Sequence, residues 1–205
     1  MIAVVDYDAG NLRSVLRALD AVGVSAALVR DPETLARADR IVFPGVGAAA
    51  SAMQTLRSRG LDGALREALG RGTPVLGICL GTQIVLDSSE EGEVACLGLL
   101  PGRTRRFRPA DPALKVPHMG WNEVRVERPH PLLAGVEPGD EFYFVHSYYP
   151  GPAEPSDVLA TTAHGERFAC ALGRGNLFAT QFHPEKSGPL GLALLARFAR
   201  WEGSC

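Results

Sequence analysis

The sequence predicts an α/β fold with a mixed, largely parallel central sheet flanked by helices, and with antiparallel β additions in the C-terminal half. Two observations carry this prediction. Short apolar runs alternate with amphipathic helical stretches through about residue 97, which is typical of parallel strands joined by right-handed crossovers. From about residue 98, short β segments follow one another instead. Neither an internal repeat nor a linker interrupts the pattern, so we expect a single domain over residues 1–205.

The elements of the first half are identified by apolar periodicity and by end signals. Gly23 ends the first helix, while Asp31 as N-cap and Pro32 as first helical residue begin the second. The predicted elements are a strand at 2–6, a helix at 12–22, a strand at 24–30, a short helix from Asp31, a strand at 40–43, helices at about 48–58 and 61–70, a strand at 74–78 and a helix from about Leu80.

The second half reads as short strands closed by one helix. Gly173–Asn176 is a hairpin turn, and His130 lies between two prolines in what we expect to be a surface turn. The predicted strands lie at 102–107, 122–126, 141–147, 157–163, 167–172 and 177–182. The last helix carries an apolar stripe at Leu190, Leu194, Leu195, Phe198 and Trp201.

Composition excludes several classes of protein. The chain has 21 basic and 23 acidic residues, a formal net charge of −2, which argues against a nucleic-acid-binding surface. We expect no membrane span, because no apolar run approaches 18 residues, and no signal peptide, because Asp6 interrupts an N-terminus without a basic flank. The four cysteines form no CxxC pair, so neither a disulfide framework nor a zinc site is indicated. We therefore expect a soluble cytoplasmic protein without a cofactor or metal.

A nucleophile elbow is the most informative local pattern. Residues Gly77–Gln83 carry Gly-x-Cys-x-Gly where the fourth strand passes into a helix. Such a turn exposes the sulfur of Cys79 at the carboxyl end of the sheet, and the helix N-terminus favours its thiolate form. The alternative is that Cys79 is a small buried apolar residue, as most free cysteines are.

A base for this thiolate is expected at His183, at the end of an apolar strand. In an extended segment Glu185 would face the same way as His183, and Pro184 limits their freedom. A carboxylate that holds one imidazole nitrogen leaves the other for Cys79. The alternatives are an exposed strand-end histidine and a metal site, and the latter lacks a third ligand nearby in sequence. The loop Pro44–Gly47 also ends a strand at this edge, where its backbone N–H groups can stabilise an oxyanion.

The motifs PGVG, GICLGTQ and QFHPE together resemble those of the class I, triad-type glutamine amidotransferases. A narrower resemblance is to the family of glutaminase subunits of imidazole glycerol phosphate synthase, and the block PHMGWN discriminates it. Its segments span nearly the whole chain in order, at 6–7, 10–14, 115–122, 144–148 and 183–187. Thr82 departs from the family, which has Met in the elbow, so its effect on the elbow stays open.

The resemblance implies roles for individual residues. Cys79 would attack the carboxamide of L-glutamine, His183 would protonate the leaving ammonia and activate water, and Glu185 would orient His183. The N–H of Leu80 and one from the Gly45–Gly47 loop would form the oxyanion hole. The implied glutamine-binding residues are Gly45, Gly47, Leu80, Gln83, Ser147 and Tyr148.

The resemblance also implies a partner, a separate (β/α)8 cyclase subunit that uses the ammonia to make imidazole glycerol phosphate and aminoimidazole carboxamide ribonucleotide in histidine biosynthesis. Independently, Trp121 lies in a stretch rich in Gly and Pro, where an exposed aromatic marks an interface, although it could equally cover the core edge. The two lysines, among 21 basic residues, both fall inside motifs. The expected interface residues are Lys115, His118, Met119, Trp121, Asn122, Tyr143 and Lys186.

Three rival functions remain open at this level. A glutaminase of pyridoxal phosphate synthesis would share the triad but has no reason to carry PHMGWN. A free-standing cysteine hydrolase would be active without a partner. A binding module with a relic triad would leave Cys79 unreactive toward a glutamine-like electrophile.

Overall fold

The first half of the chain alternates strands and helices, in agreement with the sequence pattern. The computed structural model describes residues 1–204, so the fourth cysteine, Cys205, lies outside the described residues. The elements of this half are β1 (Ile2–Val5), α1 (Leu12–Ala21), β2 (Ala26–Val29), α2 (Pro32–Ala36), β3 (Arg40–Gly45), α3 (Ala49–Ser58), α4 (Leu61–Gly70), β4 (Val75–Cys79) and α5 (Leu80–Ile84).

The second half consists of short strands, three 3₁₀ turns and one helix, so the predicted fold class is confirmed. The elements are β5 (Ser88–Ser89), β6 (Val94–Ala95), β7 (Gly102–Arg106), β8 (His118–Glu123), β9 (Arg125–Val126), η1 (Pro131–Leu133), β10 (Glu141–His146), β11 (Tyr148–Pro152), η2 (Pro155–Asp157), β12 (Val158–His164), β13 (Glu166–Arg174), β14 (Leu177–Thr180), η3 (Pro184–Lys186) and α6 (Gly188–Phe198).

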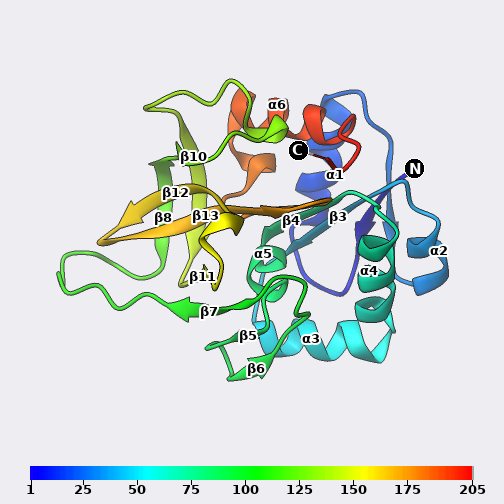
Figure 1. The fold of residues 1–205 in the computed structure, drawn as a ribbon, viewed down its shortest axis with the longest axis horizontal. Helices are drawn as coiled ribbons and strands as arrows, with labels where there is room; N and C mark the ends of the chain where they lie inside the picture. The colour runs from blue at the N-terminus through cyan, green and yellow to red at the C-terminus, as the bar shows by residue number, and fades with distance from the viewer. Residues whose placement is uncertain (205) are drawn as a thin grey trace.

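The central sheet has eight strands in the order β2-β1-β3-β4-β14-β13-β12-β9 (Figure 1). The strands from β2 to β14 pair in parallel, and those from β14 to β9 pair antiparallel. In consequence β14 lies beside β4 and runs in the same direction, although about 100 residues separate them in sequence. The carboxyl ends of β3, β4 and β14 therefore meet at one edge of the sheet.

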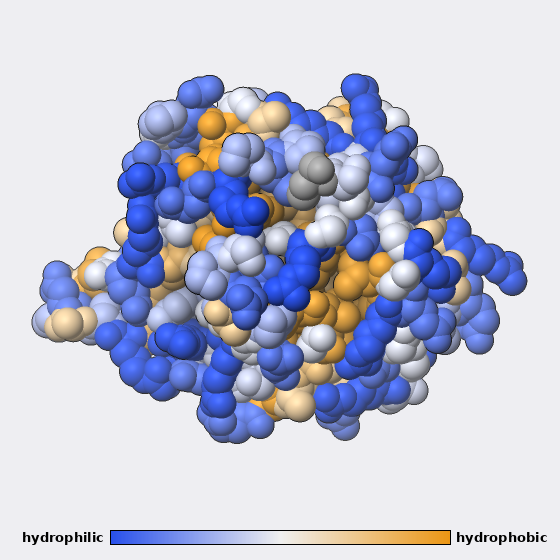
Figure 2. All heavy atoms as spheres, in the orientation of Figure 1, coloured by the Kyte–Doolittle hydropathy of each residue, from blue (hydrophilic) through white to orange (hydrophobic). Residues whose placement is uncertain are grey.

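Helices cover both faces of this sheet, with α1 and α6 on one side and α3, α4 and α5 on the other (Figure 1). Strand residues alternate between the two cores: Ala3 and Val5 pack with the α3–α5 side, and Ile2 and Val4 with the α1–α6 side. Figure 2 shows hydrophilic residues over most of the face seen in this orientation, with hydrophobic ones visible between them. No helix of the described residues is long and apolar enough to span a bilayer.

Two smaller sheets correct the sequence-based elements. The strand expected at 122–126 begins instead at His118, so β8 includes residues 118–122 of the block PHMGWN, and β8 pairs antiparallel with β10. The short strands β5, β6 and β11 were not predicted, and they join β7 in a four-stranded sheet. The prolines at 150 and 152 argue against a strand in the sequence. β11 accommodates them because it lies at the edge of its sheet, where a missing backbone N–H is tolerated.

Two further expectations are wrong in detail. His130 is buried rather than at the surface, because its ring stacks on Phe178 with the centroids 4.6 Å apart and contacts Trp201. Its Nδ1 accepts a hydrogen bond from the Leu132 N–H. The last helix ends at Phe198, so Trp201 lies beyond the helix, yet it still packs into the core.

Candidate active site

Cys79 occupies the sharp turn between β4 and α5. Its φ of 54° and ψ of −104° are unusual for a residue with a side chain, which is the backbone strain of a nucleophile elbow. The flanking glycines are sterically required. A Cβ on Gly81 would lie 1.9 Å from the Phe43 carbonyl oxygen, and one on Gly77 would lie 3.0 Å from the Ala179 Cβ.

His183 follows β14, the strand beside β4, so topology brings it to the same edge as Cys79. Its Nδ1–H donates to Glu185 Oε1 at 2.7 Å, and both side chains are buried. The proximity of His183 and Glu185 does not arise from an extended segment as expected. Residues 184–186 form the 3₁₀ turn η3, which folds the carboxylate back toward the ring.

Asn11 is a residue of this site that sequence reasoning did not single out. It precedes α1 in the left-handed conformation, with φ 72°, and its Nδ2 donates to the same Glu185 oxygen that accepts from His183. Glu185 Oε2 is buried without a partner among the described residues. The Glu185 carboxylate is thus held from a segment 174 residues away in the chain.

The electrostatics of His183 favour a protonated imidazole. Burial opposes the charge and lowers its pKa, but the adjacent Cys79 sulfur and then the Glu185 carboxylate outweigh burial, so that its pKa rises to about 10. Its Nε2 is buried and makes no hydrogen bond to any described residue, which leaves this nitrogen free for proton transfer. A thiolate paired with an imidazolium is the reactive form of a cysteine nucleophile.

The Cys79 sulfur has two further polar neighbours. Gln181 Nε2 approaches it at 3.6 Å, and the Val145 carbonyl oxygen lies 4.0 Å away. Gln181 Oε1 in turn accepts from Gln83 Nε2 at 3.0 Å, and the same nitrogen donates to the Tyr148 carbonyl at 2.9 Å. In the sequence Gln181 is only the first residue of the QFHPE motif, because its contact with the Cys79 sulfur depends on the β4–β14 pairing.

Cys79 opens on a cavity of about 200 Å³. This volume is below the range of about 300–1,000 Å³ for drug-sized ligands, so a small metabolite fits it better. Among the lining residues Glu91 alone is charged, and sequence reasoning missed it. Its Oε2 accepts from the Ala49 N–H at 2.8 Å. The lining residues are Val46, Gly47, Cys79, Leu80, Gln83, Glu91, Val145, His146, Ser147 and Tyr148.

The loop Gly45–Gly47 stands beside the elbow, because Gly45 pairs with Cys79 in the β3–β4 register. Gly47 has φ 115°, which favours glycine. Thr82, the departure from the family motif, is fully buried, and its hydroxyl donates to the Thr180 carbonyl at 2.6 Å. Its hydrogen bond joins α5 to β14, so the polar side chain is satisfied inside the core.

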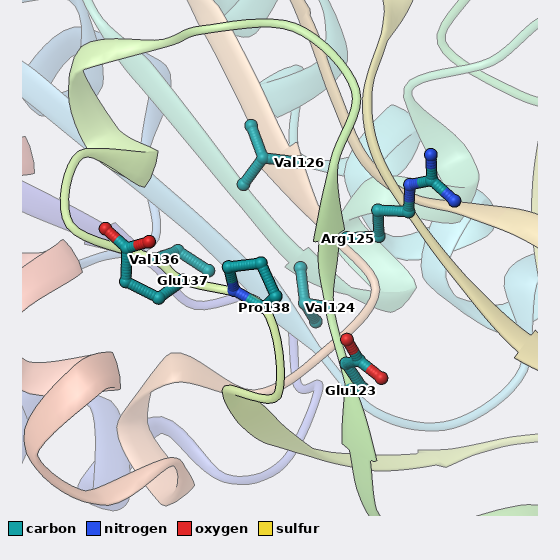
Figure 3. Close-up of a pocket in the computed structure, with 7 residues that line it drawn as sticks. All are labelled: Glu123, Val124, Arg125, Val126, Val136, Glu137 and Pro138. Carbon is teal, nitrogen blue, oxygen red and sulfur yellow. The ribbon is translucent and has the colours of Figure 1, made fainter.

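A larger cavity of about 520 Å³ contains none of these groups (Figure 3). Glu123, Val124, Arg125 and Val126 line it from β8–β9, and residues 136–138 close it from the facing loop. It offers no nucleophile, so its size does not make it the reactive site. The described residues also contain no group of three or more His, Cys, Asp or Glu side chains placed to hold a metal ion.

The expected interface residues separate into exposed and buried groups. Met119 and Trp121 are 63% and 53% exposed on β8, and Lys115 and Lys186 are also exposed. The Lys186 ammonium lies 5.7 Å from the centre of the Tyr143 ring, which itself packs edge-on against Trp121.

His118 differs from these residues because it is buried, and therefore it is not a surface contact. Its Nε2 accepts from Asn122 Nδ2 at 3.1 Å and its Nδ1–H donates to His146 Nε2 at 3.0 Å, while His146 Nδ1–H donates to the Tyr148 carbonyl at 2.7 Å. Burial lowers the pKa of His118 to about 4 and of His146 to about 3, so both rings are neutral at pH 7. These bonds connect β8 to the residues that line the Cys79 cavity.

Comparison with known proteins gives the family. The family model described as glutamine amidotransferase class-I matches residues 3–200. A protein of Synechococcus sp. strain JA-3-3Ab named "Imidazole glycerol phosphate synthase subunit HisH" is 50% identical over 202 residues, covering 98% of this chain and 93% of the relative. A Chromobacterium violaceum protein of the same name is 49% identical over 210 residues, covering 99% of each.

Solved structures agree on the fold. The structure of PurLQS from Thermotoga maritima superposes with a TM-score of 0.75 at 20% identity, covering 97% of each chain. The crystal structure of a glutamine amidotransferase gives 0.73 at 20% identity, covering 98% of this chain and 100% of that one. The near-full-length identity of about half to the HisH relatives is the more specific result. The chain belongs to the class I glutamine amidotransferases, in the family of the imidazole glycerol phosphate synthase subunit HisH.

Proposed function

We propose that the chain hydrolyses L-glutamine to glutamate and ammonia through Cys79, His183 and Glu185, and that it passes the ammonia to a (β/α)8 cyclase subunit in histidine biosynthesis. The observation that carries the proposal is the convergence of an elbow cysteine and a buried, carboxylate-paired histidine at adjacent strand ends. The relatives named as subunits of imidazole glycerol phosphate synthase support the choice of pathway over pyridoxal phosphate synthesis.

The first half of the reaction releases ammonia. The Cys79 thiolate adds to the carboxamide carbon of glutamine, and the resulting oxyanion accepts hydrogen bonds from the Leu80 N–H and from an N–H of the Gly45–Gly47 loop. His183 then gives its Nε2 proton to the leaving nitrogen as the C–N bond breaks. Ammonia departs, and a glutamyl thioester remains on Cys79.

The second half of the reaction hydrolyses the thioester. Neutral His183 takes a proton from water at Nε2, the hydroxide adds to the thioester carbon, and the C–S bond breaks. The new γ-carboxyl group loses its proton to solvent as glutamate leaves, and the proton on His183 restores the starting ion pair with the Cys79 thiolate. Glu185, held by Asn11, keeps the imidazole in the tautomer with the proton on Nδ1 throughout.

The 200 Å³ cavity supplies groups for the rest of the substrate. Glu91 is its charged residue and suits the α-ammonium of glutamine as an ion-pair partner. Ser147 and Tyr148, where β10 passes into β11, line the same cavity, and their backbone groups can bind the α-carboxylate. The Gln83 amide donates to the Tyr148 carbonyl and to Gln181 Oε1, and thereby fixes the position of the cavity wall relative to the Cys79 sulfur.

The partner surface is proposed at Met119, Trp121, Tyr143, Lys186 and Lys115. Trp121 provides an aromatic anchor on β8, beside the exposed Met119. The Lys186 ammonium contacts the Tyr143 ring; Lys186 lies three residues after His183, and Tyr143 pairs with Trp121 in the β8–β10 register. Docking here would act next to the triad. His118 and Asn122 lie behind this surface and connect it to the Cys79 cavity through the hydrogen bond of His118 to His146.

The decisive experiment combines Cys79→Ala with a cyclase subunit and its nucleotide substrate. We expect the variant complex to release no glutamate from glutamine and to keep full cyclase activity with added ammonia, which bypasses the thioester. Cys96→Ala is the matched control, because burial raises the pKa of the Cys96 thiol to about 11 and leaves it unreactive. Glutamate release by Cys79→Ala, or its loss in Cys96→Ala, would refute the nucleophile. Full glutaminase activity of the isolated chain would favour a free-standing hydrolase.

A further inference from the structure

Tyr7 has a buried hydroxyl that the proposed mechanism does not use. Tyr7 follows β1 by two residues, is 2% exposed, and packs its ring against Phe43 with the centroids 5.2 Å apart. Its Oη makes no hydrogen bond to any described residue. A buried polar group without a partner lowers the stability of the folded chain. The Tyr7 hydroxyl is therefore of benefit to the protein only if it gains a hydrogen-bond partner in another conformational state.

This hydroxyl lies directly against the loop proposed to hold the oxyanion. A Cβ on Gly45 would lie 1.9 Å from Tyr7 Oη, so the hydroxyl touches the backbone at the start of the loop. Tyr7 also lines a cavity of about 270 Å³ together with Val46, Gly47 and Leu80. The Cys79 cavity is lined by the same three residues. The Gly45–Gly47 loop is therefore a wall between the two cavities, with Cys79 on one side and Tyr7 on the other.

Peptide geometry connects the two sides of this wall. In a trans peptide the N–H and the C=O point in opposite directions. When a loop peptide directs its N–H into the Cys79 cavity, the carbonyl of that peptide turns toward the cavity that Tyr7 lines. Burial, and then the proximity of the Cys79 charge, raise the pKa of Tyr7, so its hydroxyl keeps its proton and can donate.

We propose that Tyr7 is a positioning residue of the glutaminase, whose hydroxyl donates a hydrogen bond to a carbonyl of the Gly45–Gly47 loop when that loop presents an N–H to the oxyanion. The proposal rests on the proposed function. Two observations fit a loop that has two conformations: the Tyr7 hydroxyl lacks a partner, and Gly47 has a positive φ. In the conformation that the structure describes, the Tyr7 hydroxyl makes no hydrogen bond. Tyr7 thus stabilises the reactive arrangement relative to the resting one.

The test is Tyr7→Phe, which removes one oxygen and keeps the ring. In the complex with a cyclase subunit, we expect kcat for glutamine to fall about 10- to 100-fold, as the loss of one buried hydrogen bond predicts. The KM for glutamine and the ammonia-dependent cyclase rate should stay within about twofold. The isolated variant should melt at a higher temperature than the wild type, because its buried unsatisfied hydroxyl is gone. Tyr149→Phe, which removes a tyrosine hydroxyl away from the loop, should leave kcat unchanged.

Alkylation of Cys79 by iodoacetamide separates this role from a direct effect on the thiol, because alkylation needs the thiolate but no oxyanion. Its rate and pH profile should be the same in Tyr7→Phe and wild type. A slower or pH-shifted alkylation would overturn the proposal in favour of a contact with the thiolate. A lower melting temperature would assign Tyr7 a merely structural role, and unchanged kcat would remove it from catalysis. Failure of the wild-type complex to hydrolyse glutamine would instead refute the proposed function itself.

Discussion

Substitution of Gly81 by Ala tests whether the elbow geometry creates the active site. The new Cβ would lie 1.9 Å from the Phe43 carbonyl oxygen, whereas real Cβ atoms essentially never come closer than 3.0 Å to such an atom. Strand β3 and the first turn of α5 must therefore separate by about 1 Å or more, and the obstacle is backbone rather than a side chain that can rotate. Overpacking of this kind costs about 1–3 kcal/mol of unfolding free energy, and sometimes more.

The catalytic cost of Gly81→Ala should exceed its cost in stability. The displaced residues carry the Leu80 N–H and the Gly45–Gly47 loop on either side of Cys79, and a misplacement of about 1 Å lowers turnover on the order of 10²-fold. Gly63→Ala is the matched control. Gly63 lies within α4, its Cβ would have no atom within 4 Å, and the substitution should stabilise the chain by about 0.5–1 kcal/mol without changing activity.

Urea unfolding and glutamate release by the complex measure both effects. Calorimetric titration with the cyclase subunit checks that the Gly81→Ala subunit still docks. The reasoning fails if Gly81→Ala unfolds at the same urea concentration as wild type and releases glutamate at the wild-type rate. It also fails if Gly63→Ala is impaired to the same degree, since the effect would then come from any added methyl group.

Three further predictions follow from the structure. His183→Asn should lower glutamate release by about 10²–10⁴-fold, and Glu185→Gln and Asn11→Ala should each cost less, because they lose orientation but keep the base; near-normal release by His183→Asn in a stopped assay would contradict the triad. Trp121→Ala should weaken cyclase binding about 30-fold by calorimetry without changing the melting temperature, while the exposed Leu28→Ala on β2 should have no effect. The third concerns buried histidines whose pKa values lie below the ordinary 6.5. Between pH 6.5 and about 4 these histidines bind more protons in the unfolded chain than in the folded one. Their contribution to the free energy of unfolding is therefore complete above pH 6.5 and falls as the pH drops through this window. A flat stability curve from pH 7 to 4 would contradict this. These residues are His118, His130 and His146.

The parallel half of the fold was predictable because its inner strands β1, β3 and β4 are buried on both faces and read as continuous apolar runs. The block at 118–123 was not, since β8 buries His118 and leaves Met119 and Trp121 exposed, so neither a core run nor an apolar–polar alternation marks it. Pairing with β10 holds residues 118–123 in a strand, although Pro117 precedes them and Gly120 lies among them.

The elbow and the His183–Glu185 pair could be found from sequence because their residues are neighbours in the chain. The contacts of Asn11 with Glu185 and of Gln181 with Cys79 join residues more than 100 positions apart, and no local pattern encodes them. Tyr7 is similar, since only the β1–β3 pairing and the following turn bring it beneath Gly45. The burial of His130 was not predicted, because the two flanking prolines indicate only a turn of the backbone. The aromatic rings that cover its side chain come from distant segments.

The place of β14 between β4 and β13 also sets the order in which the molecule can be completed during synthesis. Until residues 177–180 leave the ribosome, β4 is the bare edge of a four-stranded parallel sheet, and its unpaired backbone groups adjoin an entirely apolar strand. A nascent chain therefore carries its nucleophile for about 100 residues of elongation with neither the histidine nor the closing strand in place. Such a chain cannot consume glutamine, but it is exposed to aggregation, so truncations that end before β14 should accumulate as insoluble protein rather than as uncoupled glutaminase.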